Sequence, residues 1–163
     1  MKKIPVGSSN FALVDDADYD WLNQYMWHIN GGGYIQNDTK LSILSGICCS
    51  PISLMSRLIL GLRLGDKREA DHINHNLLDN QRDNLRGCTR SQNQMNKKAS
   101  SNKSSQFKGV SWSKWQKRWR VQITMDGKKI WVGFFENEKH AAHAYNLMAK
   151  KYFGKFAFLN KIA

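Results

Sequence analysis

Residues 118–124 alternate strictly between polar and apolar side chains, and this pattern constrains the fold more than any other segment. Such an alternation predicts a half-buried β-strand. The apolar set faces one side and the polar set the other: Trp119, Val121 and Ile123 against Arg118, Arg120, Gln122 and Thr124. Asp126-Gly127 predicts a hairpin turn to a strand at 129–135, and residues 108–112 predict a strand before it.

Residues 137–153 follow these strands and have helical spacing. Their apolar stripe consists of Ala141, Ala144, Tyr145, Met148 and Tyr152. A helix on the apolar face of a three-stranded antiparallel sheet would leave a cationic face exposed. Phe134 and Phe135 are expected in the core with Trp119.

The first half of the chain mixes short strands and helices, so the fold class is α+β. Residues 11–14 predict a strand, and the acidic run 15–18 then predicts a helix start, because negative charge suits a helix N-terminus. We expect the helical set Tyr19, Leu22, Tyr25 and Met26 to face the core. Gly31–Gly33 predicts a hairpin turn, and residues 52–62 after Pro51 predict a second helix.

Charge is divided unevenly along the 163 residues. The net charge is +12; residues 1–86 hold 9 basic and 10 acidic side chains (−1), and residues 87–163 hold 16 and 3 (+13). A strongly basic half indicates a polyanion partner. A basic surface that only maintains solubility is the alternative.

Cysteine usage indicates reduced thiols in an intracellular, cytoplasmic protein. Cys48-Cys49 and Cys88 form no pair with zinc-site or disulfide spacing. The N-terminus lacks an apolar stretch of signal-peptide length, and the apolar segment 43–64 is interrupted by polar and charged residues, so no membrane association is expected.

Asp71 and His72 place a carboxylate beside an imidazole at the end of a short apolar run. The carboxylate suits a hard divalent cation, and the imidazole titrates near pH ~6.5, in the range useful for accepting a proton from water. Downstream, Asn84 and Asn93 supply amide oxygens that could orient the imidazole or complete a metal site. A helix is expected from Thr89 to Asn96, since Thr89–Gln92 fits a capping box.

The words ADHINHNLLDNQRDNLR (70–86), FALVDDADYDWL and RLILGL resemble the HNH nucleases of phage and intron-encoded homing endonucleases. The resemblance implies a ββα-metal motif at 69–98 within a nuclease domain at 1–98. It implies His72 as general base, Asn84 as its orienting residue, and Asp71 and Asn93 as ligands of one Mg²⁺ or Mn²⁺. Arg57 or Arg86 would clamp phosphate.

Residues 107–160 are similar to the AP2/ERF DNA-binding domain in the words FKGVSWSKWQKRWRVQI, KIWVGFF and AAHAYNLMAKKYFGKFAFLN. The resemblance implies a domain at 107–163 whose exposed sheet face enters the major groove of duplex DNA. By position its DNA-facing set is Lys108, Ser111, Ser113, Trp115, Gln122, Thr124, Lys129 and Trp131, to which the alternation adds Arg118 and Arg120. The serine-rich segment 99–106 is expected to be a flexible linker.

Together these features predict a monomeric, site-specific, homing-type DNA endonuclease that acts on double-stranded DNA without an obligate protein partner, in a bacterial or phage-infected cell. The alternative is a sequence-specific DNA-binding protein, such as a repressor, that keeps a relic nuclease fold. Intact Asp71, His72 and Asn84 favour the enzyme, whereas Ser56, where the family usually has histidine, favours the relic. The target sequence, and whether one or both strands are cut, stay open.

Overall fold

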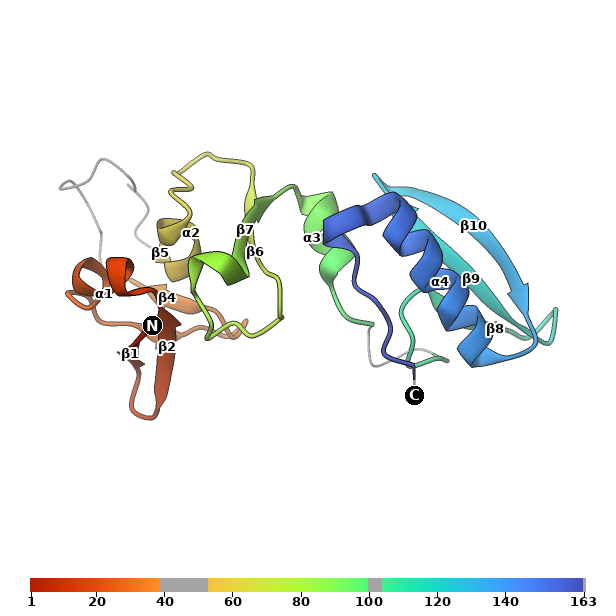
Figure 1. Cartoon of the computed structure of the whole chain (residues 1–163), viewed down its shortest axis with the longest axis horizontal. Coiled ribbons are helices and arrows are strands. Elements are labelled where there is room, and N and C mark those ends of the chain that lie inside the picture. The colour runs from red at the N-terminus through yellow and green to blue at the C-terminus, as the bar shows by residue number, and fades with distance from the viewer. Residues whose placement is uncertain (39–52, 100–103, 163) are drawn as a thin grey trace. The chain divides into compact units, whose positions relative to one another are not determined.

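The computed structural model describes residues 1–38, 53–99 and 104–162, which fall into two compact units (Figure 1). The units are Met1–Thr89 and Arg90–Ala163. Cys48-Cys49, Pro51 and residues 100–103 of the expected linker lie outside the described residues. None of the helices in the described ranges is long and apolar enough to cross a membrane.

The first unit is built from short antiparallel strands and two short helices. Its elements up to residue 59 are β1 (Lys2–Val6), β2 (Asn10–Val14), α1 (Asp16–Leu22), β3 (His28–Ile29), β4 (Ile35–Asn37), β5 (Ser53–Leu54) and α2 (Met55–Ile59). β1 pairs with β2, and a second sheet has the order β3-β4-β5. The strand predicted at 11–14, the helix after Asp15 and the turn at Gly31–Gly33 are confirmed.

The core of this unit collects apolar side chains from β1, β2, α1, β4 and α2, together with Trp27 and Leu85. Its buried members are Ile4, Val6, Ala12, Val14, Leu22, Trp27, Ile35, Met55, Leu58, Ile59 and Leu85. The prediction that Met26 is buried was wrong, since its side chain is 88% exposed. Helix α1 ends at Leu22, so the helical spacing that placed Met26 beside Leu22 no longer applies.

A two-stranded hairpin closes the first unit and carries the motif at 70–86. β6 (Glu69–His72) pairs with β7 (Leu85–Cys88), and the short 3₁₀ helix η1 (Arg82–Asn84) leads into β7. Both strands were predicted at these places. The register sets Asp71 opposite Arg86 and His72 opposite Leu85.

The helix α3 (Arg90–Asn96) packs with the second unit. The Lys108 ammonium donates to the carbonyls of Gln94 (3.0 Å) and Met95 (2.5 Å), and the Phe158 amide donates to the Met95 carbonyl (3.3 Å). The sequence predicts that this helix belongs to the domain at 1–98, as the last element of the ββα motif. The structure divides the chain after Thr89. The domain and linker limits expected from the sequence, 1–98, 99–106 and 107–163, stay predictions.

The second unit contains a three-stranded antiparallel sheet and one long helix (Figure 1). The strands are β8 (Val110–Ser113), β9 (Arg118–Met125) and β10 (Lys128–Phe135), in the order β10-β9-β8. Helix α4 (Glu138–Phe153) contacts all three strands, and the short η2 (Gly154–Phe156) follows it. The Asn137 side chain caps α4 by accepting from the amides of Lys139 and His140.

The alternation predicted along β9 is confirmed. Val121 and Ile123 are buried, whereas Arg120 and Thr124 are exposed. Asp126 and Gly127 both have positive φ (49° and 77°), as the tight turn between β9 and β10 requires.

The aromatic residues of β10 depart from the predicted pattern because the strand contains a register shift between Trp131 and Gly133. Trp131 pairs with Gln122, and Phe134 pairs with Arg120. The prediction that Phe134 is a core residue was wrong, since it is 37% exposed and its ring lies 4.7 Å from that of Trp131. One extra residue in the strand places two aromatic side chains three positions apart on the same face.

Candidate functional site

The Asp71-His72 pair ends strand β6 and is buried: 6% of Asp71 and 4% of His72 is exposed. Strand pairing with Leu85 and Arg86 fixes the backbone of both residues. The Ile73 amide donates to the Asn84 carbonyl (2.9 Å), which extends this pairing by one residue. A carboxylate and an imidazole therefore occupy defined positions at the end of the hairpin where the connecting loop begins.

The Nε2 atom of His72 lies 3.2 Å from Oδ1 of Asn80. Asn80 is itself 1% exposed, and its Nδ2 donates to the Leu77 carbonyl (3.1 Å), which orients the amide with its oxygen toward the ring. An amide oxygen only accepts, so Nε2 carries the proton of the neutral imidazole and Nδ1 carries the lone pair. Asn80 thereby selects one tautomer of His72.

Burial lowers the pKa of His72 below its usual value, although the hydrogen bond to Asn80 and the nearby Asp71 and Asp79 act in the opposite direction. The ring is therefore neutral near pH 7. A neutral imidazole of fixed tautomer is the form that accepts a proton from water.

Asn84 was predicted to orient His72, and this role stays a prediction; the structure shows a contact of the ring with Asn80. The Asn84 side chain accepts from the Asn74 amide (3.0 Å) and donates to the Asp79 carbonyl (2.7 Å). Both polar atoms thus hold the loop between β6 and η1. Nothing in the spacing of Asn80 from His72 along the chain marks it as a partner of the imidazole.

The Asp71 carboxylate forms an ion pair with Arg86 across the hairpin, at 2.7 Å and 2.8 Å from two guanidinium nitrogens. Only 13% of the Arg86 side chain is exposed, so this predicted phosphate clamp lies directly beside the carboxylate. Its contact with phosphate stays a prediction.

The donor chemistry of Asp71 fits a hard divalent cation, since carboxylate and amide oxygens are the ligands that Mg²⁺ prefers. Such an ion would compete with Arg86 for Oδ2 of Asp71. Over the described ranges, histidine, cysteine, aspartate and glutamate side chains form no cluster of three or more that could hold a metal. The second predicted ligand, Asn93, lies in α3 of the other unit, and its metal contact stays a prediction.

The loop that presents Asn80 is held to helix α1 by an ion pair that the sequence pattern does not predict. The Arg82 guanidinium donates to both oxygens of Asp18 at 2.7 Å, and the Arg82 amide donates to Asp15 at 2.8 Å. Asp18 is only 2% exposed. The acidic run after β2 therefore anchors the motif loop in addition to starting a helix.

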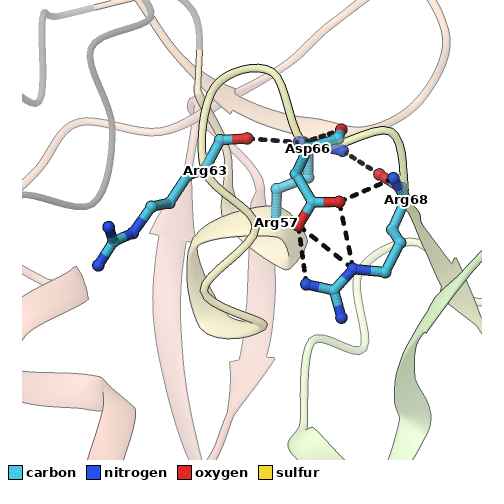
Figure 2. A network of polar contacts seen from close by, with 4 residues as sticks. All are labelled: Arg57, Arg63, Asp66 and Arg68. Carbon is cyan, nitrogen blue, oxygen red and sulfur yellow. Dashed lines mark hydrogen bonds and ion pairs between the residues drawn. The ribbon is translucent and has the colours of Figure 1, made fainter.

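Arg57, the other predicted phosphate clamp, holds the chain that leads into β6 (Figure 2). Its guanidinium donates to the carbonyls of Arg68 (2.6 Å), Arg63 (3.3 Å) and Asp66 (3.3 Å). Figure 2 also shows the Arg68 guanidinium against the Asp66 carboxylate, which keeps the pKa of Asp66 at about 2. These bonds give Arg57 a structural function in this loop, and its contact with DNA stays a prediction.

In the second unit the sheet places most of the predicted DNA-facing side chains on its outer face. Cross-strand pairs set Ser111 opposite Arg120, Lys129 opposite Thr124 and Trp131 opposite Gln122. Ser113 pairs with Arg118 at the end of β8. Phe134 joins this face through the register shift and was missed.

Two of the predicted residues form polar contacts within the protein, and a third is highly exposed. Lys108 donates to the end of α3, and Arg118 lies 3.1 Å from Glu136. Trp115 lies in the β8–β9 connection and is 90% exposed. Contact of these side chains with DNA stays a prediction.

The sequence of this chain matches a known protein family. Residues 63–95 match the family model described as HNH endonuclease. The chain is 32% identical over 157 residues to a protein named as an uncharacterized HNH endonuclease of Acanthamoeba polyphaga mimivirus; the match spans 96% of this chain and 78% of the relative. The chain belongs to the HNH endonuclease family.

Two further relatives match shorter parts. Protein 3.8 of Escherichia phage T7 is 41% identical over 59 residues, which span 36% of this chain and 49% of the relative. The ethylene-responsive transcription factor WRI1 of Arabidopsis thaliana is 32% identical over 72 residues, which span 38% of this chain and 17% of the relative. No solved structure matches.

Proposed function

We propose that this protein is a DNA endonuclease that hydrolyses phosphodiester bonds with His72 as general base. The observation that carries the proposal is the buried His72 ring, held in one tautomer by Asn80 and adjacent to the Asp71 carboxylate. Family membership supports it, and the low pKa of His72 keeps the base unprotonated near pH 7.

In this mechanism Nδ1 of His72 takes a proton from the attacking water, while Asn80 holds the ring through Nε2. Asn84 keeps the loop around the base in place through its bonds to Asn74 and Asp79. Mg²⁺ or Mn²⁺, held by Asp71 and Asn93, would supply positive charge for the transition state and the leaving oxygen. Arg86 adds a fixed cation beside the same carboxylate.

We further propose that the second unit directs cleavage to particular sites on double-stranded DNA, as in homing endonucleases, and that the protein works as a monomer. The outer face of the sheet carries polar and basic side chains from β8, β9 and β10, and β-strands can enter the major groove of duplex DNA. The partial match to an ethylene-responsive transcription factor supports an AP2/ERF-type docking mode.

A second candidate is a DNA-binding protein with a relic nuclease unit. The ion pair between Asp71 and Arg86 favours this second candidate, because Arg86 neutralises the carboxylate without a metal. Ser56 is buried in α2 at the position where the family usually has histidine.

Nicking of supercoiled plasmid with and without Mg²⁺ separates the two candidates. We expect Mg²⁺-dependent nicking that falls roughly 10²–10⁴-fold in His72→Ala, with DNA affinity unchanged. Asp71→Ala should abolish the Mg²⁺-dependent part. His140→Ala, an exposed histidine of α4, serves as control and should cut at the wild-type rate. If the wild-type protein binds DNA but never nicks it, the second candidate, a DNA-binding protein with a relic nuclease unit, is correct.

A further inference from the structure

A groove of about 930 Å³ lies within the second unit, between α3 and the outer face of the sheet. One wall is formed by α3 and the residues that follow it, including Gln94, Lys97 and Lys98. The opposite side is formed by strand residues that include Arg120, Gln122 and Thr124. The groove thus continues the face on which the predicted DNA-facing residues lie.

The lining of this groove is strongly cationic. Its basic side chains are Arg90, Lys97, Lys98, Lys108 and Arg120, against a single acidic one, Asp126. Lys97 and Lys98 are exposed directly after the last residue of α3, and Arg90 is exposed at its start. Two adjacent ammonium groups on long stems suit phosphate oxygens, since lysine acts on phosphate as a mobile point charge.

The wall is held to the sheet by specific bonds. Lys108, which precedes β8, donates to the last carbonyls of α3 at Gln94 and Met95, where a cation is favourable. At the other end of α3 the Asp126 amide, in the β9–β10 turn, donates to Ser91 Oγ (3.3 Å). The two sides of the groove therefore keep a defined separation before any ligand binds.

We propose that this groove binds the sugar–phosphate backbone of one strand of duplex DNA, so that α3 belongs to the DNA interface together with the sheet. The inference rests on the proposed function in that the ligand is double-stranded DNA. Lys97 and Lys98 hold phosphates on one side, while Gln122 and Thr124 present an amide and a hydroxyl to base edges on the other. Lys108 acts as a positioning residue that keeps α3 at the sheet.

Fluorescence anisotropy with a labelled duplex of about 30 base pairs tests the proposal in the full chain, in EDTA so that no cleavage occurs. The double variant Lys97→Ala/Lys98→Ala is compared with Lys150→Ala/Lys151→Ala. The second pair is also adjacent and exposed, lies in the last turn of α4 outside the groove, and changes the net charge equally. Urea unfolding checks that both variants are folded.

We expect the groove variant to bind about 10- to 60-fold more weakly at ~0.1 M salt and to lower the slope of log K against log salt by about 1.8, the value for two lost phosphate contacts. The α4 variant should change both quantities much less. Lys97→Arg/Lys98→Arg should keep wild-type affinity, because arginine also binds phosphate.

Equal losses of DNA affinity in the two alanine variants would mean that only net charge matters. That result would overturn the proposal that the groove binds DNA, while DNA binding by the protein itself would stand. Wild-type affinity in Lys97→Ala/Lys98→Ala would overturn it in the same way. Absence of DNA binding by the wild-type protein would overturn the proposed function together with the groove.

Discussion

Asn80 is the residue whose position most directly determines the chemistry of His72. Replacing it with leucine removes the acceptor at 3.2 Å from Nε2 and keeps the branched arrangement of non-hydrogen atoms in the side chain. We expect nicking to fall roughly 10²-fold because the base loses its fixed orientation. Single-turnover nicking rates measure the effect.

Asn80→Asp is the matched variant, since it keeps an acceptor toward the ring. It should retain more activity than Asn80→Leu, and both should bind DNA as the wild type does. If the two variants lose equal activity, the hydrogen bond to His72 does not matter and Asn80 only shapes the loop.

Gly109 is a second position where the identity of a single residue affects the stability of the fold. A Cβ atom there would lie 2.1 Å from Cδ2 of Tyr145, and the backbone has φ +76°. Gly127 has φ +77° with nothing within 4 Å of its Cβ position, so it isolates the cost of the backbone conformation.

We expect Gly127→Ala to lower the free energy of unfolding by about 1–2 kcal/mol, the cost of a left-handed conformation. Gly109→Ala should lose about 1–3 kcal/mol more, because the Tyr145 ring must move in a packed core. The urea midpoints of both variants measure the difference. Similar midpoints would show that the core absorbs the extra methyl group without cost.

At the level of elements, the β6–β7 hairpin buries a thiol whose ionisation links stability to pH. Burial, with added repulsion from Asp71 and Glu69, raises the pKa of Cys88 to about 11. An unfolded thiol loses its proton near pH ~8.5. Between these values the unfolded chain binds fewer protons than the folded one, so stability falls as pH rises.

We therefore expect the free energy of unfolding to decrease between pH 8.5 and 11 more steeply in the wild type than in Cys88→Ala. The slopes should differ by up to about 1.4 kcal/mol per pH unit, the value for one proton. Urea unfolding across this range gives both slopes. Parallel curves would mean that the Cys88 thiol ionises equally in both states.

Helix α3 packs with the second unit through contacts with residues that lie far from it in the sequence. Residues 90–96 are helical, as the capping box at Thr89–Gln92 predicts, because helix formation depends on neighbouring residues. Its bonds to Lys108 and Phe158 depend on the folded sheet and on the chain after α4. The sequence therefore predicted the helix but not the unit with which it packs.

For the whole molecule, this packing predicts how the chain can be divided. A fragment of residues 90–163 keeps α3 with Lys108 and Phe158, whereas a fragment of residues 99–163 lacks α3 and with it the buried Met95. We expect the longer fragment to have the higher Tm, and its sheet amides to exchange more slowly with solvent. Thermal unfolding monitored by circular dichroism compares the two.

Equal Tm values for the two fragments would show that α3 adds nothing to the second unit. The domain boundary expected after Lys98 would then describe the stability of the chain better than the division at Thr89.

The sequence by itself determined what depends on neighbours in the chain. Strand β9 follows from its alternation, the turn at Asp126-Gly127 from the residues that tolerate positive φ, and the adjacency of Asp71 and His72 from the peptide bond between them. Each of these is a local property, since backbone geometry repeats over two to four residues.

Only the tertiary structure decided which distant groups meet. Asn80 reaches His72 because Arg82 anchors the loop on Asp18, 64 residues earlier in the chain. Phe134 reaches the outer face because a register shift interrupts the strand period, and α3 reaches the sheet because Lys108 satisfies its last carbonyls. Such contacts form only where folding brings complementary buried polar groups within hydrogen-bond distance, and the spacing of residues along the chain does not encode that distance.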